Sequence, residues 1–145
     1  MIRFMNIPRL ILAIVVGFVV IFGTDFLIHG IWMAPDYQAT QQLWRPEAEM
    51  ASYRWWMFVA QLLLVFAFVM LWTRWASTAR ITCAIGYGLL MGIFSGTWAI
   101  IMYVVLPMPC GIACKWFFAG IAQCILLGIV TFFVYKPAQA AAPLS

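Results

Sequence analysis

Asp25 and His29 are the residues whose types and spacing are best suited to chemistry. They lie four positions apart in the segment FGTDFLIHG, residues 22–30, and His29 is the single histidine of the chain. Residues four apart share one face of a helix, so the carboxylate and the imidazole can interact. Such a pair can hold a cation or pass a proton to water, because histidine titrates near neutral pH. The same pair can also serve only to fix the end of a helix.

The composition of the chain is that of a membrane protein. Of its 145 residues, 67% are hydrophobic and 8% are charged, and the mean hydropathy is +1.04. These values lie outside those of ordinary soluble domains. The net charge is +4, but in a membrane protein the distribution of Lys and Arg between loops is more informative than the total. We therefore expect the lipid bilayer as a partner, and no nucleic acid.

Four segments are long and apolar enough to cross a bilayer. A hydrocarbon core about 30 Å thick requires roughly 20 apolar residues of helix, because each residue rises about 1.5 Å. The predicted spans cover about residues 10–33, 55–73, 81–105 and 116–135. They predict an all-α integral membrane protein, a four-transmembrane-helix bundle that forms a single domain over residues 1–136. The small, proline-interrupted tail at 137–145 is expected to be disordered.

The basic residues predict that both termini are cytoplasmic. On the side of the termini lie Arg3, Arg9, Arg74, Arg80 and Lys136, and on the other side lie Arg45, Arg54 and Lys115. Cytoplasmic loops carry the excess of positive charge. The expected location is the bacterial inner (cytoplasmic) membrane, with the first and third loops on its outer side.

Each predicted span carries a polar side chain at a similar depth. Counting about 1.5 Å per residue places Asp25 about 8 Å below the outer face of the core. The same count gives about 9 to 10 Å for Gln61, Ser95 and Gln123. An isolated carboxylate or amide that faces lipid costs at least about 2 to 3 kcal/mol. We therefore expect these four groups to face one another inside the bundle, as one polar layer.

Three interpretations of this layer remain open. In the first, Asp25 and His29 form a hydrogen-bonded pair that caps the outer end of the bundle, since buried polar groups need partners. In the second, Asp25 is the titrating group of a proton or cation site, His29 relays protons to the outer water, and the other polar groups orient the ligand. In the third, the layer contacts a partner protein. One histidine cannot by itself build a bis-histidine haem or multi-histidine metal site, so we expect no resident metal or cofactor.

The third span carries small residues at a strict spacing of four: Ala84, Gly88, Gly92 and Gly96. Small residues at this spacing leave a flat groove in which another helix backbone can approach closely. The spacing predicts a tight helix contact along this groove. The second helix lies either in the same monomer or in another protein chain.

The first outer loop, PDYQATQQLWRPEAEM at residues 35–50, contains two prolines and several helix formers. Leu43 and Trp44 indicate a short helix on the membrane surface. Pro46 can start a helix with Glu47 and Glu49 in its first turn. The second helix is therefore expected to begin before it enters the lipid.

Two cysteines, Cys110 and Cys114 in PMPCGIAC, are predicted to lie in the second outer loop. In an oxidising compartment they can form a disulfide. They can also remain reduced thiols, or join Met108 in a soft-metal site, because thiolates and a thioether suit Cu(I). Cys83 and Cys124, within the spans, are expected to pack as small apolar residues.

The segments GTDFLIHG and WRPEAEM, the glycine-rich third span and the last span ending in VYKP resemble short bacterial four-span membrane proteins of families of unknown function. This resemblance covers most of the chain and implies the fold without an activity. In size, and in the acid of its first span, the chain is also similar to the small multidrug-resistance transporters, which implies transport. In that family the acid is a glutamate in the middle of the membrane, whereas Asp25 is predicted near one face.

The sequence leaves three functional classes open. The leading one is a structural or accessory subunit of a membrane assembly, either a homo-oligomer or a larger membrane protein complex, because no phosphate loop, activated nucleophile or metal cluster is visible. The alternative is a small proton- or metal-cation-coupled transporter or channel that uses Asp25 and His29. A second alternative is thiol or copper handling at Cys110 and Cys114 on the periplasmic side. An enzyme is not expected, because a single histidine and four acids supply little acid–base machinery.

Overall fold

The computed structural model describes residues 5–76 and 80–135, and within them the chain is helical, with no strand. The long helices are α1 (Ile7–Asp25), α3 (Glu47–Leu71), α4 (Ile81–Val105) and α5 (Cys110–Val134). Two π-helical segments, η1 (Phe26–Trp32) and η3 (Trp72–Ala76), continue α1 and α3. Between α1 and α3 lie the short α2 (Ala34–Ala39) and a 3-10 turn, η2 (Gln41–Leu43). The tail predicted to be disordered, 137–145, lies outside the described residues.

Four helical stretches are long and apolar enough to cross a membrane: Ile7–Trp32, Glu47–Arg74, Ile81–Val105 and Cys110–Val134. The prediction of an all-α, four-transmembrane-helix bundle is confirmed. Two of the helices begin earlier than the spans predicted at 55 and 116. Hydropathy locates only the part of a helix that crosses lipid. Each of these two helices begins directly after a proline, Pro46 for α3 and Pro109 for α5. The short helix expected at Leu43 and Trp44 is instead the 3-10 turn η2.

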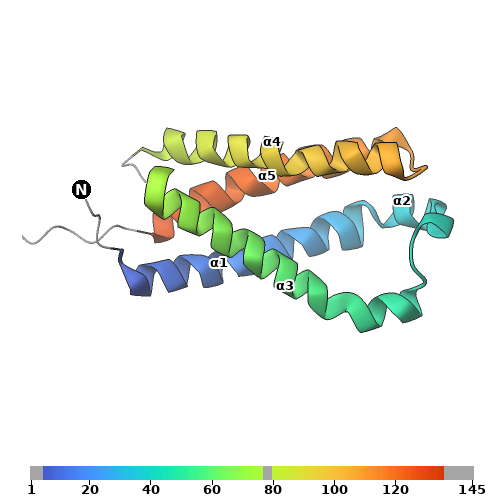
Figure 1. The fold of residues 1–145 in the computed structure, drawn as a ribbon, viewed down its shortest axis with the longest axis horizontal. Helices are drawn as coiled ribbons and strands as arrows, with labels where there is room; N and C mark the ends of the chain where they lie inside the picture. Colours follow the sequence, from blue (N-terminus) through green and yellow to red (C-terminus); the bar gives the residue numbers. More distant parts are fainter. Residues whose placement is uncertain (1–4, 77–79, 136–145) are drawn as a thin grey trace, which may run out of the picture.

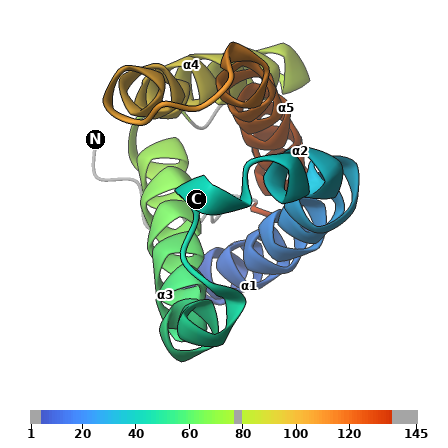
Figure 2. The ribbon, with the colours of Figure 1, turned by 90° about the vertical axis from the view of Figure 1, so that its right-hand side faces the viewer.

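The helices run between two ends of the molecule (Figure 1). One end carries α2 and the connection from α4 to α5, and we call it the α2 end; the other, where α1 begins and α5 ends, we call the terminal end. Viewed along the bundle, α1, α3, α4 and α5 surround a common axis, and α2 lies over the α2 end (Figure 2). Because α3 is inclined to its neighbours, its first turns lie away from α4 and α5 (Figures 1 and 2).

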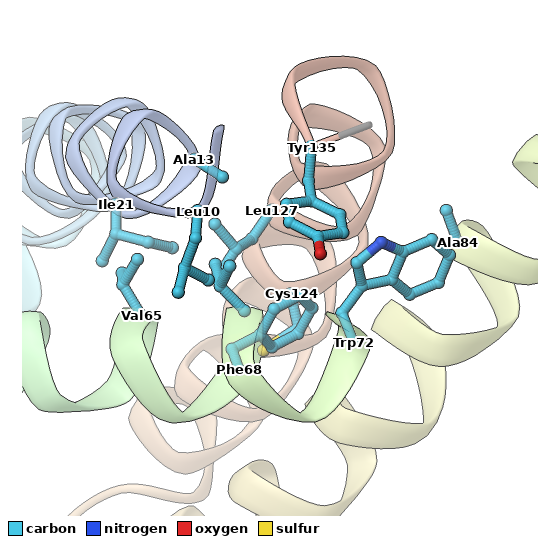
Figure 3. Packing of buried hydrophobic residues seen from close by; sticks show 11 residues of the cluster. Leu10, Ala13, Ile21, Val65, Phe68, Trp72, Ala84, Cys124, Leu127 and Tyr135 are labelled. Carbon is cyan, nitrogen blue, oxygen red and sulfur yellow. The ribbon is translucent and has the colours of Figure 1, made fainter. Parts of the chain in front are cut away.

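The apolar core lies toward the terminal end, where α3 approaches the other helices (Figure 3). Its buried members are Leu10, Ala13, Ile21, Val65, Phe68, Val69, Trp72, Ala84, Cys124, Leu127 and Tyr135. Tyr87 of α4 donates a hydrogen bond of 2.8 Å to the carbonyl oxygen of Phe68 in α3. This bond and the core hold α3 against α4 at the terminal end.

The ladder of small residues on α4 packs against α5. Ala84, Gly88, Gly92 and Gly96 are all buried. A Cβ atom added to Gly92 would lie 2.6 Å from the Cα atom of Ile121, and one added to Gly88 would collide with the carbonyl oxygen of Cys124. The two backbones therefore touch along this groove, and the structure places the predicted contact within the monomer.

Replacing Gly88 tests this contact, because its missing side chain is what allows α5 to approach. We expect Gly88→Ala to lower the free energy of unfolding by about 1 to 3 kcal/mol, since the backbones must separate. Gly86 is the control: it lies on the same helix, and an added Cβ meets nothing within 4 Å. Gly86→Ala should leave stability unchanged or raise it by about 0.5 to 1 kcal/mol through helix propensity. Denaturant unfolding in detergent, followed by circular dichroism, measures both; equal effects would contradict the packing.

Candidate functional site

Asp25, the last residue of α1, is the centre of a polar cluster within the bundle. Its Oδ1 atom accepts a hydrogen bond of 2.7 Å from Nε2 of Gln123, and its Oδ2 atom accepts one from Nε2 of Gln61. Nε2 of Gln123 also donates to the hydroxyl oxygen of Thr24, at 2.9 Å. We call Thr24, Asp25, Gln61 and Gln123 the polar cluster. It joins α1, α3 and α5, and it brings together three of the four groups of the predicted layer.

The polar cluster leaves one buried hydrogen-bond acceptor without a donor. Both carboxylate oxygens of Asp25 accept from amides, and among the described residues no lysine or arginine forms an ion pair with it. The Oε1 atom of Gln61 is buried and has no hydrogen-bond partner. An ionised carboxylate and an amide oxygen both require donors or cations. Chemically, the cluster can therefore take up a proton on Asp25 or a small cation between its oxygens.

Ser95, the fourth member of the predicted layer, does not join the cluster. It is exposed, its hydroxyl donates to the carbonyl oxygen of Gly92 at 3.3 Å, and its Oγ atom lies 3.9 Å from Sγ of Cys124. A serine in a helix can satisfy its hydroxyl on a carbonyl of the preceding turn. The expectation that all four groups face one another is therefore wrong for Ser95, because equal depth does not fix the direction in which a side chain points.

His29 does not form the expected pair with Asp25. Its Nδ1 atom lies 2.6 Å from the hydroxyl oxygen of Tyr37, and no hydrogen bond joins it to Asp25 in the described part of the chain. The segment that carries His29 is π-helical. The imidazole therefore faces α2, while both carboxylate oxygens of Asp25 are taken by the amides of Gln61 and Gln123. The expected Asp25–His29 hydrogen bond is wrong because each side chain finds its partners on other elements, which spacing along one helix does not reveal.

Tyr37 is the centre of a second group of side chains, at the α2 end. Its hydroxyl oxygen accepts a hydrogen bond of 2.7 Å from Nε1 of Trp116 in α5, and it also lies 3.6 Å from Sδ of Met33. Trp44 packs edge-on against Tyr37, with ring centroids 5.5 Å apart. We call His29, Tyr37, Trp44 and Trp116 the aromatic cap. It ties η1, α2 and the loop after η2 to the first turns of α5.

The hydroxyl proton of Tyr37 has two acceptors within reach, Nδ1 of His29 and Sδ of Met33. Burial raises the pKa of Tyr37, the hydrogen bond from Trp116 opposes this rise, and the nearby Asp36 carboxylate adds to it. Tyr37 is therefore a neutral phenol at physiological pH. Its hydroxyl can donate a hydrogen bond to Nδ1 of a neutral His29. When His29 is protonated, the hydroxyl oxygen can instead accept a hydrogen bond from it and donate one to Sδ of Met33.

An ion pair also holds α2 against α5. Nζ of Lys115 lies 2.6 Å from Oδ2 of Asp36, and both side chains are about one-third exposed, at 33% and 30%. The same ammonium group lies 5.2 Å from the ring centroid of Trp32. A pair this exposed contributes roughly 0 to 1 kcal/mol, so it orients α2 more than it stabilises the fold.

Cys110 and Cys114 lie in the first turns of α5, and the expectation that they lie in a loop is wrong. Their Sγ atoms are 3.6 Å apart, and both are free, exposed thiols in the structure. Met108, which would complete a soft-metal site, is buried against Met33 and Ile112 instead. Among the described residues no group of three or more His, Cys, Asp or Glu side chains could hold a metal ion. Of the remaining cysteines, Cys83 is exposed and Cys124 is buried.

Comparisons of the chain with protein-family models, with curated proteins and with solved structures find no match. Its function is therefore argued from geometry. The fold and the polar cluster define its class: a four-helix membrane protein that holds a carboxylate between amide side chains inside the bundle.

The coupling between Gln123 and Asp25 can be measured. We expect Gln123→Leu to lower the free energy of unfolding by about 1 to 3 kcal/mol, because Asp25 and Thr24 each lose a donor. Combined with Asp25→Asn, it should cost less than the sum of the single changes, by at least about 0.5 kcal/mol. A double-mutant cycle from denaturant unfolding in detergent gives this value. Strict additivity would contradict the contact.

Proposed function

We propose that the protein is a small transporter or channel that binds a proton or a small metal cation at Asp25 and moves it across the membrane. One observation carries the proposal. Asp25 lies within the bundle and is held by amides from two other helices, without a basic partner among the described residues, while the acceptor Oε1 of Gln61 has no donor. We further propose, with the distribution of Lys and Arg as support for the orientation, that the termini are cytoplasmic and that the protein lies in a bacterial inner membrane.

Joining helices inside a bundle does not require a carboxylate. Amides and hydroxyls can join helices inside a bundle without carrying charge. A charged side chain in the membrane costs about 2.5 to 3.5 kcal/mol, and such residues commonly line ion or proton pathways. A cation bound between Asp25 and the unpaired Oε1 of Gln61 would satisfy that oxygen and reduce the cost of the buried charge.

The two directions from the polar cluster differ. Toward the α2 end, His29 and Tyr37 follow and form a hydrogen-bonded pair that can pass a proton. Toward the terminal end lies the apolar core, in which Val65 and Leu127 are fully buried. We therefore propose that protons or cations reach Asp25 from the α2 end, and that passage to the terminal end requires the core to open.

Flux through reconstituted protein tests this proposal. Vesicles containing the wild-type protein should take up protons, sodium or potassium faster than protein-free vesicles. Asp25→Asn should reduce this flux by about tenfold or more, because the amide can neither release a proton nor neutralise a cation. Glu49→Gln is the matched control, since it removes an exposed carboxylate outside the cluster, and it should leave the flux unchanged. Wild-type flux equal to that of protein-free vesicles, or full flux in Asp25→Asn, would overturn the proposal.

A second candidate, a structural or accessory subunit of a membrane assembly, is favoured by the exposure of α3. All residues from 51 to 58 are exposed, which covers the entire circumference of two turns of the helix. Large apolar side chains occur on several sides of it, including Trp55, Trp56 and Met57, each more than half exposed. A neighbouring helix, from a second copy or from another protein, would pack against these turns.

Native mass spectrometry in mild detergent tests the subunit candidate. We expect a mass of two or more times 16.5 kDa, or a mass that includes a second protein. Trp56→Ala should reduce the population of the complex by about tenfold, because interface tryptophans dominate association. Phe94→Ala, on the exposed face of α4, should have no effect. A mass of 16.5 kDa alone would contradict this candidate.

A further inference from the structure

A pocket of about 820 Å³ lies at the α2 end, away from the polar cluster. Its walls come from α2 and η2, from the loop that leads into α3, and from Trp116 of α5. The volume falls within the range of small-molecule sites, roughly 300 to 1,000 Å³. The pocket shares Tyr37 with the proposed proton path, but none of its lining residues belongs to the polar cluster.

One wall of the pocket is aromatic and fixed in orientation. The rings of Trp44 and Trp116 are 5.9 Å apart, and Tyr37 packs against Trp44. The indole N–H of Trp116 is bonded to Tyr37, and that of Trp44 donates to Oγ1 of Thr40 at 2.9 Å. The ring N–H groups are therefore occupied, and the wall offers aromatic surface to a ligand. Aromatic surfaces of this kind attract organic cations.

The opposite charges of the pocket are Arg45 and Glu47, on either side of Pro46. The guanidinium carbon of Arg45 lies 4.5 Å from the ring centroid of Tyr53, which holds the group in place. Neither side chain forms an ion pair within the described ranges. A guanidinium binds phosphate through two parallel hydrogen bonds, and a carboxylate beside aromatic rings binds an ammonium group. The pocket thus complements a ligand that carries both charges.

The level of the pocket indicates where such a ligand comes from. The helices that are long and apolar enough to cross the membrane end or begin at Trp32, Glu47, Val105 and Cys110 on this side, so the pocket lies level with these helix ends, just outside the hydrocarbon core. Tryptophans gather at this boundary, as indoles do at the level of the lipid headgroups. A zwitterionic headgroup lies at this height in every bilayer that contains one.

We propose that the pocket binds the headgroup of a zwitterionic phospholipid. Arg45 binds its phosphodiester, and Glu47 together with the wall of Tyr37, Trp44 and Trp116 binds its ammonium group. The bound lipid would fill the space between the cap and the start of α3, which α2 and η2 leave open. This inference does not depend on transport at Asp25.

Native mass spectrometry with defined lipids tests the proposal. Protein stripped of lipid is mixed with equal amounts of phosphatidylethanolamine and the anionic phosphatidylglycerol. We expect the wild-type protein to retain the zwitterionic lipid, and Arg45→Gln and Glu47→Gln each to reduce its retention by about tenfold. Arg54→Gln and Glu49→Gln are matched controls, because they remove exposed charges that do not line the pocket.

The outcomes separate the possible sources of the ligand. Soluble glycerophosphoethanolamine, added at the same concentration, should not displace the lipid, because it lacks the acyl chains that anchor the headgroup at the membrane boundary. Complete displacement would overturn the lipid as the occupant. Preferential retention of phosphatidylglycerol, or unchanged retention in both pocket variants, would overturn recognition of a zwitterion. Circular dichroism of each variant establishes that its helices are intact.

Discussion

The arrangement of the helices depends on the cost of a carboxylate away from water. Hydrocarbon offers Asp25 no partner, so the donors must come from the protein itself. Gln61 and Gln123 supply them, and each lies on a different helix. These bonds fix the rotation of α1, α3 and α5 about their axes. Apolar contacts alone specify this rotation less strictly, because an apolar side chain can face either lipid or another helix. In the resulting site one buried acceptor, Oε1 of Gln61, has no donor.

The bundle is held together by different means at its two ends. α4 and α5 touch along small residues from Ala84 to Gly96, and toward the terminal end α3 completes an apolar core with Trp72 and Phe68. At the α2 end, hydrogen bonds to Tyr37 and the Asp36–Lys115 ion pair tie the short elements to α5, while residues 51–58 in the first turns of α3 stay exposed. The open part of the molecule therefore coincides with the part that carries its polar side chains.

Much of the fold could be predicted from the sequence, because the length and hydropathy of a span have a direct physical meaning. Depth along each helix also brought Asp25, Gln61 and Gln123 to one level, and they do meet. Depth did not give the rotation of α4, so Ser95 was placed wrongly. The aromatic cap joins residues far apart in the chain, such as Tyr37 and Trp116. In the sequence, only the occurrence of tryptophans near the predicted span boundaries pointed to it. The π-helical geometry of η1 has no counterpart in hydropathy.

That wide-turned stretch has a consequence for the direction in which the chain leaves α1. Each residue of a π-helix turns less about the axis than in an α-helix, so over Phe26–Trp32 the winding falls behind that of an α-helix by part of a turn. The start of α2 therefore lies on another side of the α1 axis than an α-helical continuation would give it. A change of pitch confined to this segment would turn α2, and with it the phenol of Tyr37, relative to Trp116, while the core at the terminal end stayed in place.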